Sequence, residues 1–407
     1  MYSIICQNCK TKLHERTYWI VCPHCKGSIG FAYNASSLRV DSNSQSMWRY
    51  RELLPIEGGQ EIISLHEGQT PLEAAKSFPP RTIYLKNETI NPTGSHKDRA
   101  LSIGITKAIE FKHDAVMLYS DGSTALSSAA YAARAGIRSI VTVARGTPSY
   151  RLLPLIIYDA HIIEYQGAAA EALDWVHECC RALGLYETST YRRANPYECE
   201  GPKTIGLEIV DQMGCSPDWI VVPVGGGGTL AGIWRGLGEL DKLGVAKNRT
   251  RMVGVLPAGF TALKIALERS VENENELWAL APPEPPATIQ AKIAMSRPPD
   301  GLEAVEAVRD SEGLLLFVSD EEVLAAQRDL ATREGIYAEP SGAAAYAGVK
   351  QLLKTGRVAP RESVVAIITG SGFRETATLH DGRGLQVLPV AARDGFNVIQ
   401  QILGQPK

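Results

Sequence analysis

Residues 219–230 read Trp-Ile-Val-Val-Pro-Val-Gly-Gly-Gly-Gly-Thr-Leu. The apolar run at 219–224 is typical of a buried strand, and a helical pattern follows over Leu230–Leu240. Four glycines at such a junction let the backbone approach an anion, because the start of the helix offers unpaired N–H groups and a favourable dipole. The sequence therefore predicts a phosphate cradle, with a flexible glycine turn as the alternative. The residues of this cradle are Gly225, Gly226, Gly227, Gly228 and Thr229.

Apolar runs and Ala-rich helical patterns alternate along the chain from about residue 47. This alternation is typical of the α/β class, in which helices cover mostly parallel sheets. Examples of the predicted strands are Thr82–Leu85, Ala115–Tyr119, Ser139–Val143, His161–Tyr165, Trp219–Val224, Met252–Leu256 and Val364–Ile368. The predicted helices include Ser127–Ala135, Ala168–Ala182 and Asp320–Glu334.

A second motif, Asn-Pro-Thr-Gly-Ser-His-Lys-Asp-Arg-Ala at residues 91–100, predicts a turn that leads into a helix. Ser95 can cap this helix, which places Lys97 in its first turn, where the helix dipole disfavours the ammonium form. A lysine in that setting is a candidate for Schiff-base formation with a carbonyl compound. An ordinary surface lysine is the alternative when the motif is considered alone.

Two further loops follow predicted strands. Residues 120–124 (Ser-Asp-Gly-Ser-Thr) form a second helix start suited to an anion, although Asp121 there must either meet a cation or face solvent. Residues 369–372 (Thr-Gly-Ser-Gly) close the strand Val364–Ile368. A hydroxyl at that edge of a sheet can bond a heterocycle nitrogen, and a simple turn is the alternative.

Four of the eight cysteines lie within the first 25 residues, as two Cys-x-x-Cys pairs. Their spacing can present four thiolates tetrahedrally to one Zn²⁺, which predicts a structural zinc ribbon at residues 1–34. A polar, Ser-rich linker follows at residues 35–46. The alternative is that the pairs have lost the metal and form disulfides. The predicted metal ligands are Cys6, Cys9, Cys22 and Cys25.

The composition is that of a globular protein and excludes wholesale disorder. The chain has 407 residues, 44% of them hydrophobic, with 42 Lys+Arg against 45 Asp+Glu. A slightly acidic balance argues against a nucleic-acid or membrane-surface partner. No apolar stretch approaches the ~18 residues of a membrane span, and the N-terminus has no secretory pattern. We therefore expect a cytoplasmic protein.

Taken in order, these motifs resemble the fold-type II enzymes that depend on pyridoxal 5′-phosphate (PLP), and most closely the threonine synthase family. The resemblance spans about residues 64–375. Its other pieces are His66–Leu72, Ala129–Gly136, Asn195–Pro196, Glu200–Thr204 and Glu334–Ser341. It implies a large PLP-binding α/β domain at residues 47–105 and 205–407, a small α/β domain at 106–204, and a homodimer.

The resemblance also implies roles for individual residues. Lys97 would bind PLP covalently and act as acid and base, and Thr369 would contact the pyridine nitrogen of PLP. The implied cofactor-binding residues are Lys97, Ser123, Gly225, Gly226, Gly227, Gly228, Thr229 and Thr369. The implied substrate-binding residues are Ser120, Asp121, Gly122, Thr124 and Lys203.

The sequence departs from the family pattern near the implied substrate site. Ser123 stands where Asn is usual, Asp121 where a hydroxyl residue is usual, and His96 where Phe is typical. Residues 372–375 read Gly-Phe-Arg-Glu where Leu/Phe-Lys-Asp is usual. Because a carboxylate repels a substrate carboxylate, a substrate with an extra cation for Asp121 is one expectation.

The implied function is a carbon–oxygen lyase that performs elimination or replacement on a small amino acid. Threonine synthase, which converts O-phosphohomoserine and water to threonine and phosphate, is the leading candidate. The alternatives are a serine/threonine dehydratase or β-replacement synthase, and a zinc-ribbon binding protein with an inactive enzyme body. A nucleotide-binding protein is disfavoured, because the glycine loop lacks the lysine of an NTPase loop.

Overall fold

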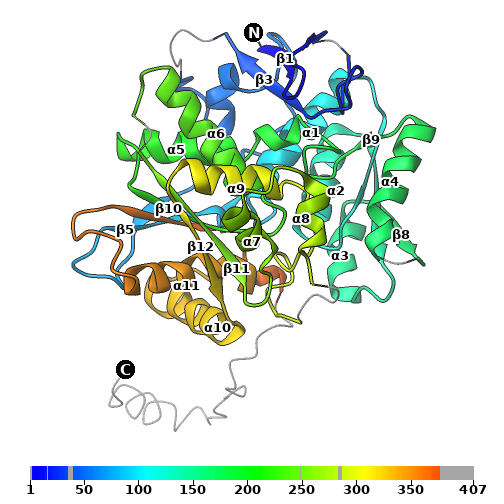
Figure 1. Ribbon diagram of the computed structural model, residues 1–407. Helices are drawn as coiled ribbons and strands as arrows, with labels where there is room; N and C mark the ends of the chain where they lie inside the picture. Colours follow the sequence, from blue (N-terminus) through cyan, green and yellow to red (C-terminus); the bar gives the residue numbers. More distant parts are fainter. Residues whose placement is uncertain are drawn as a thin grey trace, which may run out of the picture. The chain divides into compact units, whose positions relative to one another are not determined.

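Three β-sheets and eleven α-helices organise the described part of the chain (Figure 1). The computed structural model describes residues 2–15, 17–34, 40–167, 169–247, 249–282 and 287–375. Within these ranges, no helix is long and apolar enough to cross a membrane.

The largest sheet has six strands in the order β12-β11-β10-β13-β5-β4. All neighbouring strands are parallel except β4, which pairs antiparallel with β5 at the edge. The strands are β4 (Leu72–Ala74), β5 (Ile83–Asn87), β10 (Trp219–Pro223), β11 (Arg251–Pro257), β12 (Leu314–Val318) and β13 (Val364–Ile368). The central strands are buried on both faces, which explains their continuous Val/Ile runs.

Successive residues of this sheet face two different hydrophobic cores. Ile220 and Val222 pack with helices α5 to α9, whereas Trp219 and Val221 pack with α10 and α11. Figure 1 shows α10 and α11 together on one side of the strands and α6 and α9 on the other. These helices are α5 (Lys203–Met213), α6 (Gly228–Lys242), α7 (Ala262–Arg269), α8 (Glu274–Ala279), α9 (Gly301–Asp310), α10 (Asp320–Asp329) and α11 (Pro340–Lys354).

A second, four-stranded sheet is parallel throughout, with the order β8-β7-β6-β9. Its strands are β6 (Ala115–Tyr119), β7 (Arg138–Ala144), β8 (His161–Tyr165) and β9 (Tyr186–Glu187). The associated helices are α2 (Ser123–Ala135), α3 (Ser149–Ile157) and α4 (Ala169–Leu183). Helix α1 (Lys97–Glu110) packs beside α2 and enters this sheet's hydrophobic core through Leu101 and Ile105.

The N-terminal sheet is small and antiparallel, in the order β2-β1-β3. It comprises β1 (Tyr2–Cys6), β2 (Lys12–Leu13) and β3 (Ile29–Tyr33). Ile4 and Ile29 are fully buried in a core that also contains Ile103 of α1. The Lys107 amine of α1 donates to the Tyr2 hydroxyl at 3.1 Å and lies 4.5 Å from the centre of the Phe111 ring. The ribbon is therefore packed onto the helix that begins at Lys97.

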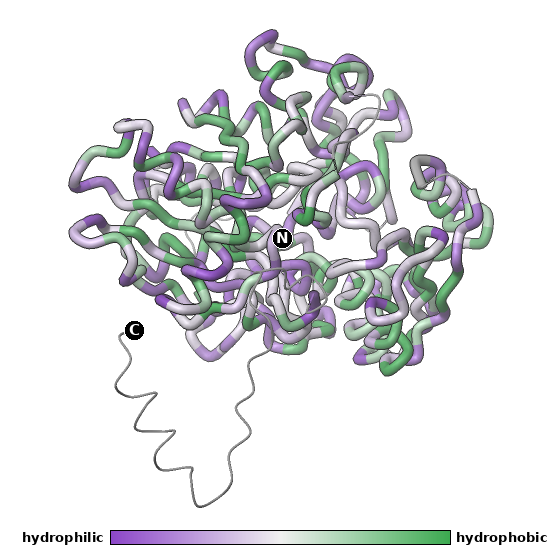
Figure 2. The backbone as a smooth tube through the Cα atoms, turned by 90° about the horizontal axis from the view of Figure 1, so that it is seen from below, coloured by the Kyte–Doolittle hydropathy of each residue, from purple (hydrophilic) through white to green (hydrophobic). Residues whose placement is uncertain are grey.

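The predicted α/β class is confirmed, as are all seven predicted strands, to within a few residues at their ends. Figure 2 shows hydrophobic and hydrophilic stretches alternating along the backbone. The four-stranded sheet falls inside residues 106–204, but the division into two domains stays a prediction. Parts of the predicted linker (35–39) and of the large domain (376–407) lie outside the described residues.

Candidate active site at the edge of the large sheet

Three predicted site segments lie at the carboxyl edge of the six-stranded sheet. Strands β10, β13 and β5 are parallel neighbours, so the segments that follow them emerge at one edge, where ligands of open α/β sheets bind. The glycine loop follows β10, Thr369 follows β13, and the turn into α1 follows β5. Backbone hydrogen bonds join the last two segments, since Ser371 N–H donates to Gly94 O at 2.9 Å.

The Lys97 side chain is half-buried in the first turn of α1. Its amine donates a hydrogen bond to Thr190 Oγ1 at 2.9 Å. Burial lowers the pKa of Lys97, and the neighbouring acidic groups of Asp300, Cys199 and Glu198 only partly oppose this. The amine is therefore more easily uncharged than that of a surface lysine, as a nucleophile or base must be.

The glycine loop is shaped by close backbone contacts. Gly227 has φ +100°, and a Cβ there would lie 2.4 Å from the Asp300 carbonyl oxygen. A Cβ on Gly228 would lie 2.6 Å from Asp300 Oδ2, and one on Gly225 would lie 3.0 Å from Ile293 Cα. A side chain at Gly227 or Gly228 would clash, and α6 begins at Gly228, so its first N–H groups have no partner within the helix. This geometry is compatible with the predicted backbone anion cradle and with the phosphate of PLP as its ligand.

The predicted substrate loop, residues 120–124, connects β6 to α2 in the other sheet. Ser120 Oγ accepts a hydrogen bond from Gly122 N–H at 3.2 Å. Asp121 pairs with Arg151 of α3 at 2.5 Å, and Arg151 also pairs with Glu375 at 3.3 Å. The chain itself therefore supplies a cation for Asp121, which does not support the expectation of a substrate with an extra cation.

Cationic side chains join this loop to the edge of the large sheet. Arg374, which follows β13, donates to Ser123 Oγ at 2.9 Å and pairs with Glu339 at 3.2 Å. Lys292 pairs with Glu375 at 2.9 Å, and its amine lies 2.6 Å from the position of a Cβ on Gly122. The loop containing Ser123 is thereby held next to the loop containing Thr369. Sequence reasoning missed Arg151, Lys292 and Arg374, and only the departure at residues 372–375 pointed toward one of them.

Lys203, the remaining predicted substrate ligand, makes its contacts elsewhere. Its side chain is fully buried in α5, where the amine pairs with Glu200 at 2.8 Å and Glu239 at 3.1 Å. It also lies 3.7 Å from the centre of the Tyr33 ring in the ribbon. These contacts give Lys203 a structural role at the ribbon interface, and they do not support its prediction as a substrate ligand. An intact motif does not reveal which way a lysine points.

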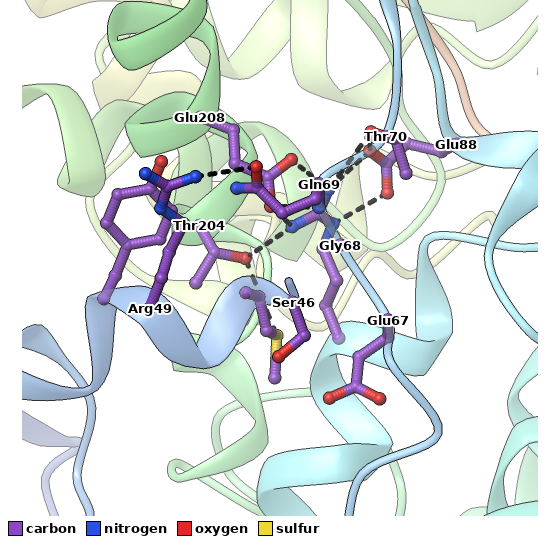
Figure 3. A network of polar contacts seen from close by, with 12 residues as sticks. Ser46, Arg49, Glu67, Gly68, Gln69, Thr70, Glu88, Thr204 and Glu208 are labelled. Atoms are coloured by element: carbon purple, nitrogen blue, oxygen red, sulfur yellow. Dashed lines mark hydrogen bonds and ion pairs between the residues drawn. The ribbon is translucent and has the colours of Figure 1, made fainter. Parts of the chain in front are cut away.

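A buried ionic network connects the first turn of α1 to neighbouring elements. Arg99, two residues after Lys97, is fully buried and pairs with Glu88 at 2.7 Å and Glu208 at 2.6 Å. Lys86 pairs with the other oxygen of Glu208 at 2.7 Å. Figure 3 shows Glu88 and Glu208 with Thr70 and Thr204 around this network. Two cations balance two carboxylates, so the network is neutral as a whole and fixes the start of α1 against β5 and α5.

The four N-terminal thiols form a compact cluster. Their sulfur atoms all lie within 4.8 Å of one another, with Cys6–Cys25 at 3.4 Å and Cys9–Cys22 at 3.7 Å. All four cysteines are free of disulfides, which argues against the disulfide alternative. Four sulfurs at about 2.3 Å from one Zn²⁺ would be ~3.8 Å apart, close to these distances. The cluster therefore fits a tetrahedral metal.

Comparison with known proteins identifies the family. The family model "Pyridoxal-phosphate dependent enzyme" matches residues 63–370. A threonine synthase of Methanosarcina acetivorans is 34% identical over 392 residues, covering 94% of each chain. A threonine synthase of Mycobacterium bovis is 36% identical over 346 residues, covering 84% of this chain and 92% of its own.

Solved structures confirm the fold. The processed form of threonine deaminase isoform 2 from Solanum lycopersicum superposes with a TM-score of 0.64 at 21% identity, covering 78% of this chain and 88% of its own. That likeness supports the fold-type II architecture expected from the sequence. On the sequence matches and the fold together, the chain belongs to the threonine synthase family of pyridoxal-phosphate-dependent enzymes.

Proposed function

We propose that this chain catalyses the threonine synthase reaction, in which O-phosphohomoserine and water give threonine and phosphate. The relatives named threonine synthase align over most of both chains, which supports this reaction over others of the fold. The observation that carries the proposal is that the turn into α1 with Lys97, the glycine loop and Thr369 follow neighbouring parallel strands at one edge of the sheet, where His96 contacts both Thr229 and Thr369.

Four features of the site would hold PLP. The Lys97 amine would bind it covalently, and the N–H groups of residues 225–229 would bind its phosphate. Thr369 would face the pyridine nitrogen of PLP. Ser123, from the loop of residues 120–124, would contact the PLP ring. Bound there, PLP supplies an electron sink that makes the proton on the substrate Cα removable.

The chain's own groups would then bind the substrate and move its protons. Lys97, whose pKa is lowered by burial, would take the Cα proton, with Thr190 positioning its amine. The start of α2 and the N–H groups of residues 120–124 would hold the substrate carboxylate. Arg151 neutralises Asp121, so this carboxylate is not repelled.

Product analysis tests the proposal. The purified protein is loaded with PLP and incubated separately with O-phosphohomoserine, L-threonine and L-serine. We expect threonine and inorganic phosphate from the first, in equal amounts, and negligible ammonia from the others. An oxo acid and ammonia from serine or threonine would indicate a dehydratase instead. A colourless protein without turnover that binds nucleic acid in a salt-sensitive way would indicate a ribbon-bearing binding protein.

We also propose that Cys6, Cys9, Cys22 and Cys25 hold a structural Zn²⁺. The ribbon is too small to be stabilised by its own core, and metal binding contributes directly to folding such a domain. Reduced thiols suit the cytoplasm, and family analogy suggests a homodimer.

A metal analysis with one cysteine variant tests the zinc proposal. We expect one equivalent of zinc per chain in the wild type and loss of that zinc in C22S, because Cys22 is a buried ligand. Residues 1–34 should then become more sensitive to protease. The matched control is C215S, because Cys215 is exposed and outside the cluster. Equal zinc content in C22S and C215S would contradict the assignment.

A further inference from the structure

His96, the residue before Lys97, contacts two of the other predicted cofactor anchors. Its Nδ1 lies 3.1 Å from the Thr369 carbonyl oxygen, and its Nε2 lies 3.1 Å from Thr229 Oγ1. Its backbone N–H also donates to the Thr369 carbonyl at 3.0 Å. One side chain therefore links the start of α1, the glycine loop and the end of β13.

The partners of the ring determine its hydrogen positions. Nδ1 lies 3.1 Å from the Thr369 carbonyl oxygen and, at the longer distance of 3.4 Å, from Ser95 Oγ, which already accepts the Lys97 N–H. Because a carbonyl oxygen only accepts, the closer contact assigns the proton of a neutral imidazole to Nδ1. Nε2 is then an acceptor, and Thr229 must donate its hydroxyl hydrogen to it. Burial and the charge of Lys97 lower the pKa of His96 to about 3, so the ring is neutral at ordinary pH. Of the other nearby charges, Glu88 favours the imidazolium and Arg374 disfavours it.

We propose that His96 is a positioning residue whose neutral, Nδ1-protonated ring accepts the Thr229 hydroxyl and so fixes the glycine loop relative to Lys97. This inference rests on the proposed PLP site. With its hydroxyl hydrogen committed to His96, Thr229 offers a phosphate only its backbone N–H. The phosphate is thus bound by main-chain donors, while His96 holds the loop that presents them.

Two substitutions of His96 test whether its hydrogen bonds position the glycine loop or whether its ring only fills space. H96L removes both side-chain hydrogen bonds and leaves the Thr229 hydroxyl and the Thr369 carbonyl without these partners. H96Q keeps an amide oxygen that can reach Thr229. We expect H96L to raise the dissociation constant for PLP about tenfold, because both side-chain hydrogen bonds that fix the loop are lost, and H96Q to raise it by less than about threefold, because the contact with Thr229 can be kept. The matched control is H113L, because His113 Nδ1 also contacts a carbonyl, that of Gly184 at 2.9 Å, outside the site.

Nitrogen NMR of histidine-labelled protein gives the direct readout. The His96 signals, assigned by their absence in H96L, should show a protonated Nδ1 and an unprotonated Nε2 at every pH from about 5 to 9. A protonated Nε2, a charged ring, or equal PLP affinity in wild type and H96L would each overturn the inference. Failure of the wild type to bind PLP would instead overturn the proposed function, so the two failures are distinguishable.

Discussion

Replacing Lys97 by alanine is expected to abolish covalent PLP binding and to lower turnover at least ~1,000-fold, since a group that moves the substrate proton is lost. The fold should survive, because among the described residues the Lys97 amine makes one side-chain hydrogen bond, to Thr190, and its burial already disfavours its charge. Absorbance spectra, steady-state kinetics and thermal unfolding of wild type and K97A measure these effects.

A matched substitution shows whether the loss is specific. Lys264 of α7 is half-exposed, and within the described part of the chain its ion-pair partner is Glu268 on its own helix, at 3.8 Å. K264A should retain the spectrum and turnover of the wild type. Covalent PLP and measurable turnover in K97A would show that another lysine carries the chemistry.

The second large effect is expected on stability. R99M should lower the free energy of unfolding by about 3–5 kcal/mol, because it leaves Glu88 and Glu208 buried with Lys86 as their remaining ionic partner in this network. The exposed pair Arg138–Asp114, with side chains 63% and 85% exposed, provides the control. R138M should cost at most about 1 kcal/mol. Denaturant unfolding at pH 7 compares the variants, and equal losses would contradict the role given to Arg99.

The same network predicts a pH dependence. Burial alone would raise the pKa of Glu208, but the charges of Arg99 and Lys86 lower it to about 2. A carboxylate with a lowered pKa stabilises the fold above its unfolded pKa, and this contribution is lost as the pH falls toward its folded value. The wild type should therefore lose stability between about pH 4.5 and 2, and the R99M penalty should shrink over that window.

Much of the sheet architecture could be predicted from sequence, because a strand buried on both faces needs a continuous apolar run. Val364–Ile368 and Ala115–Tyr119 match β13 and β6 at both ends. The prediction missed β12, Leu314–Val318, an edge strand whose residues are mostly half-buried. It also carried one helix through residue 334, where the structure turns from α-helix to π-helix at Leu330. Helix ends depend on tertiary contacts that periodicity does not report.

The site was only partly predictable. Lys97, the glycine loop and Thr369 follow strands of one parallel sheet, so the rule for sheet edges places them together. The Arg151–Glu375 ion pair joins residues 224 positions apart, and the Arg374–Ser123 hydrogen bond joins residues 251 positions apart. No local pattern encodes such contacts, nor the ion pairs that Lys292 and Arg374 make. His96 was visible in the sequence only as a departure from the family. Its proposed positioning role rests on the contacts of both ring nitrogens, which only the structure gives.

The most direct test of the account is the site of covalent PLP attachment. The purified protein is incubated with PLP, reduced with borohydride, digested, and analysed by mass spectrometry for the modified lysine. We expect a visible absorption band that reduction abolishes, and a single modified peptide that contains Lys97. A modification on another lysine, or none after incubation with excess PLP, would contradict it.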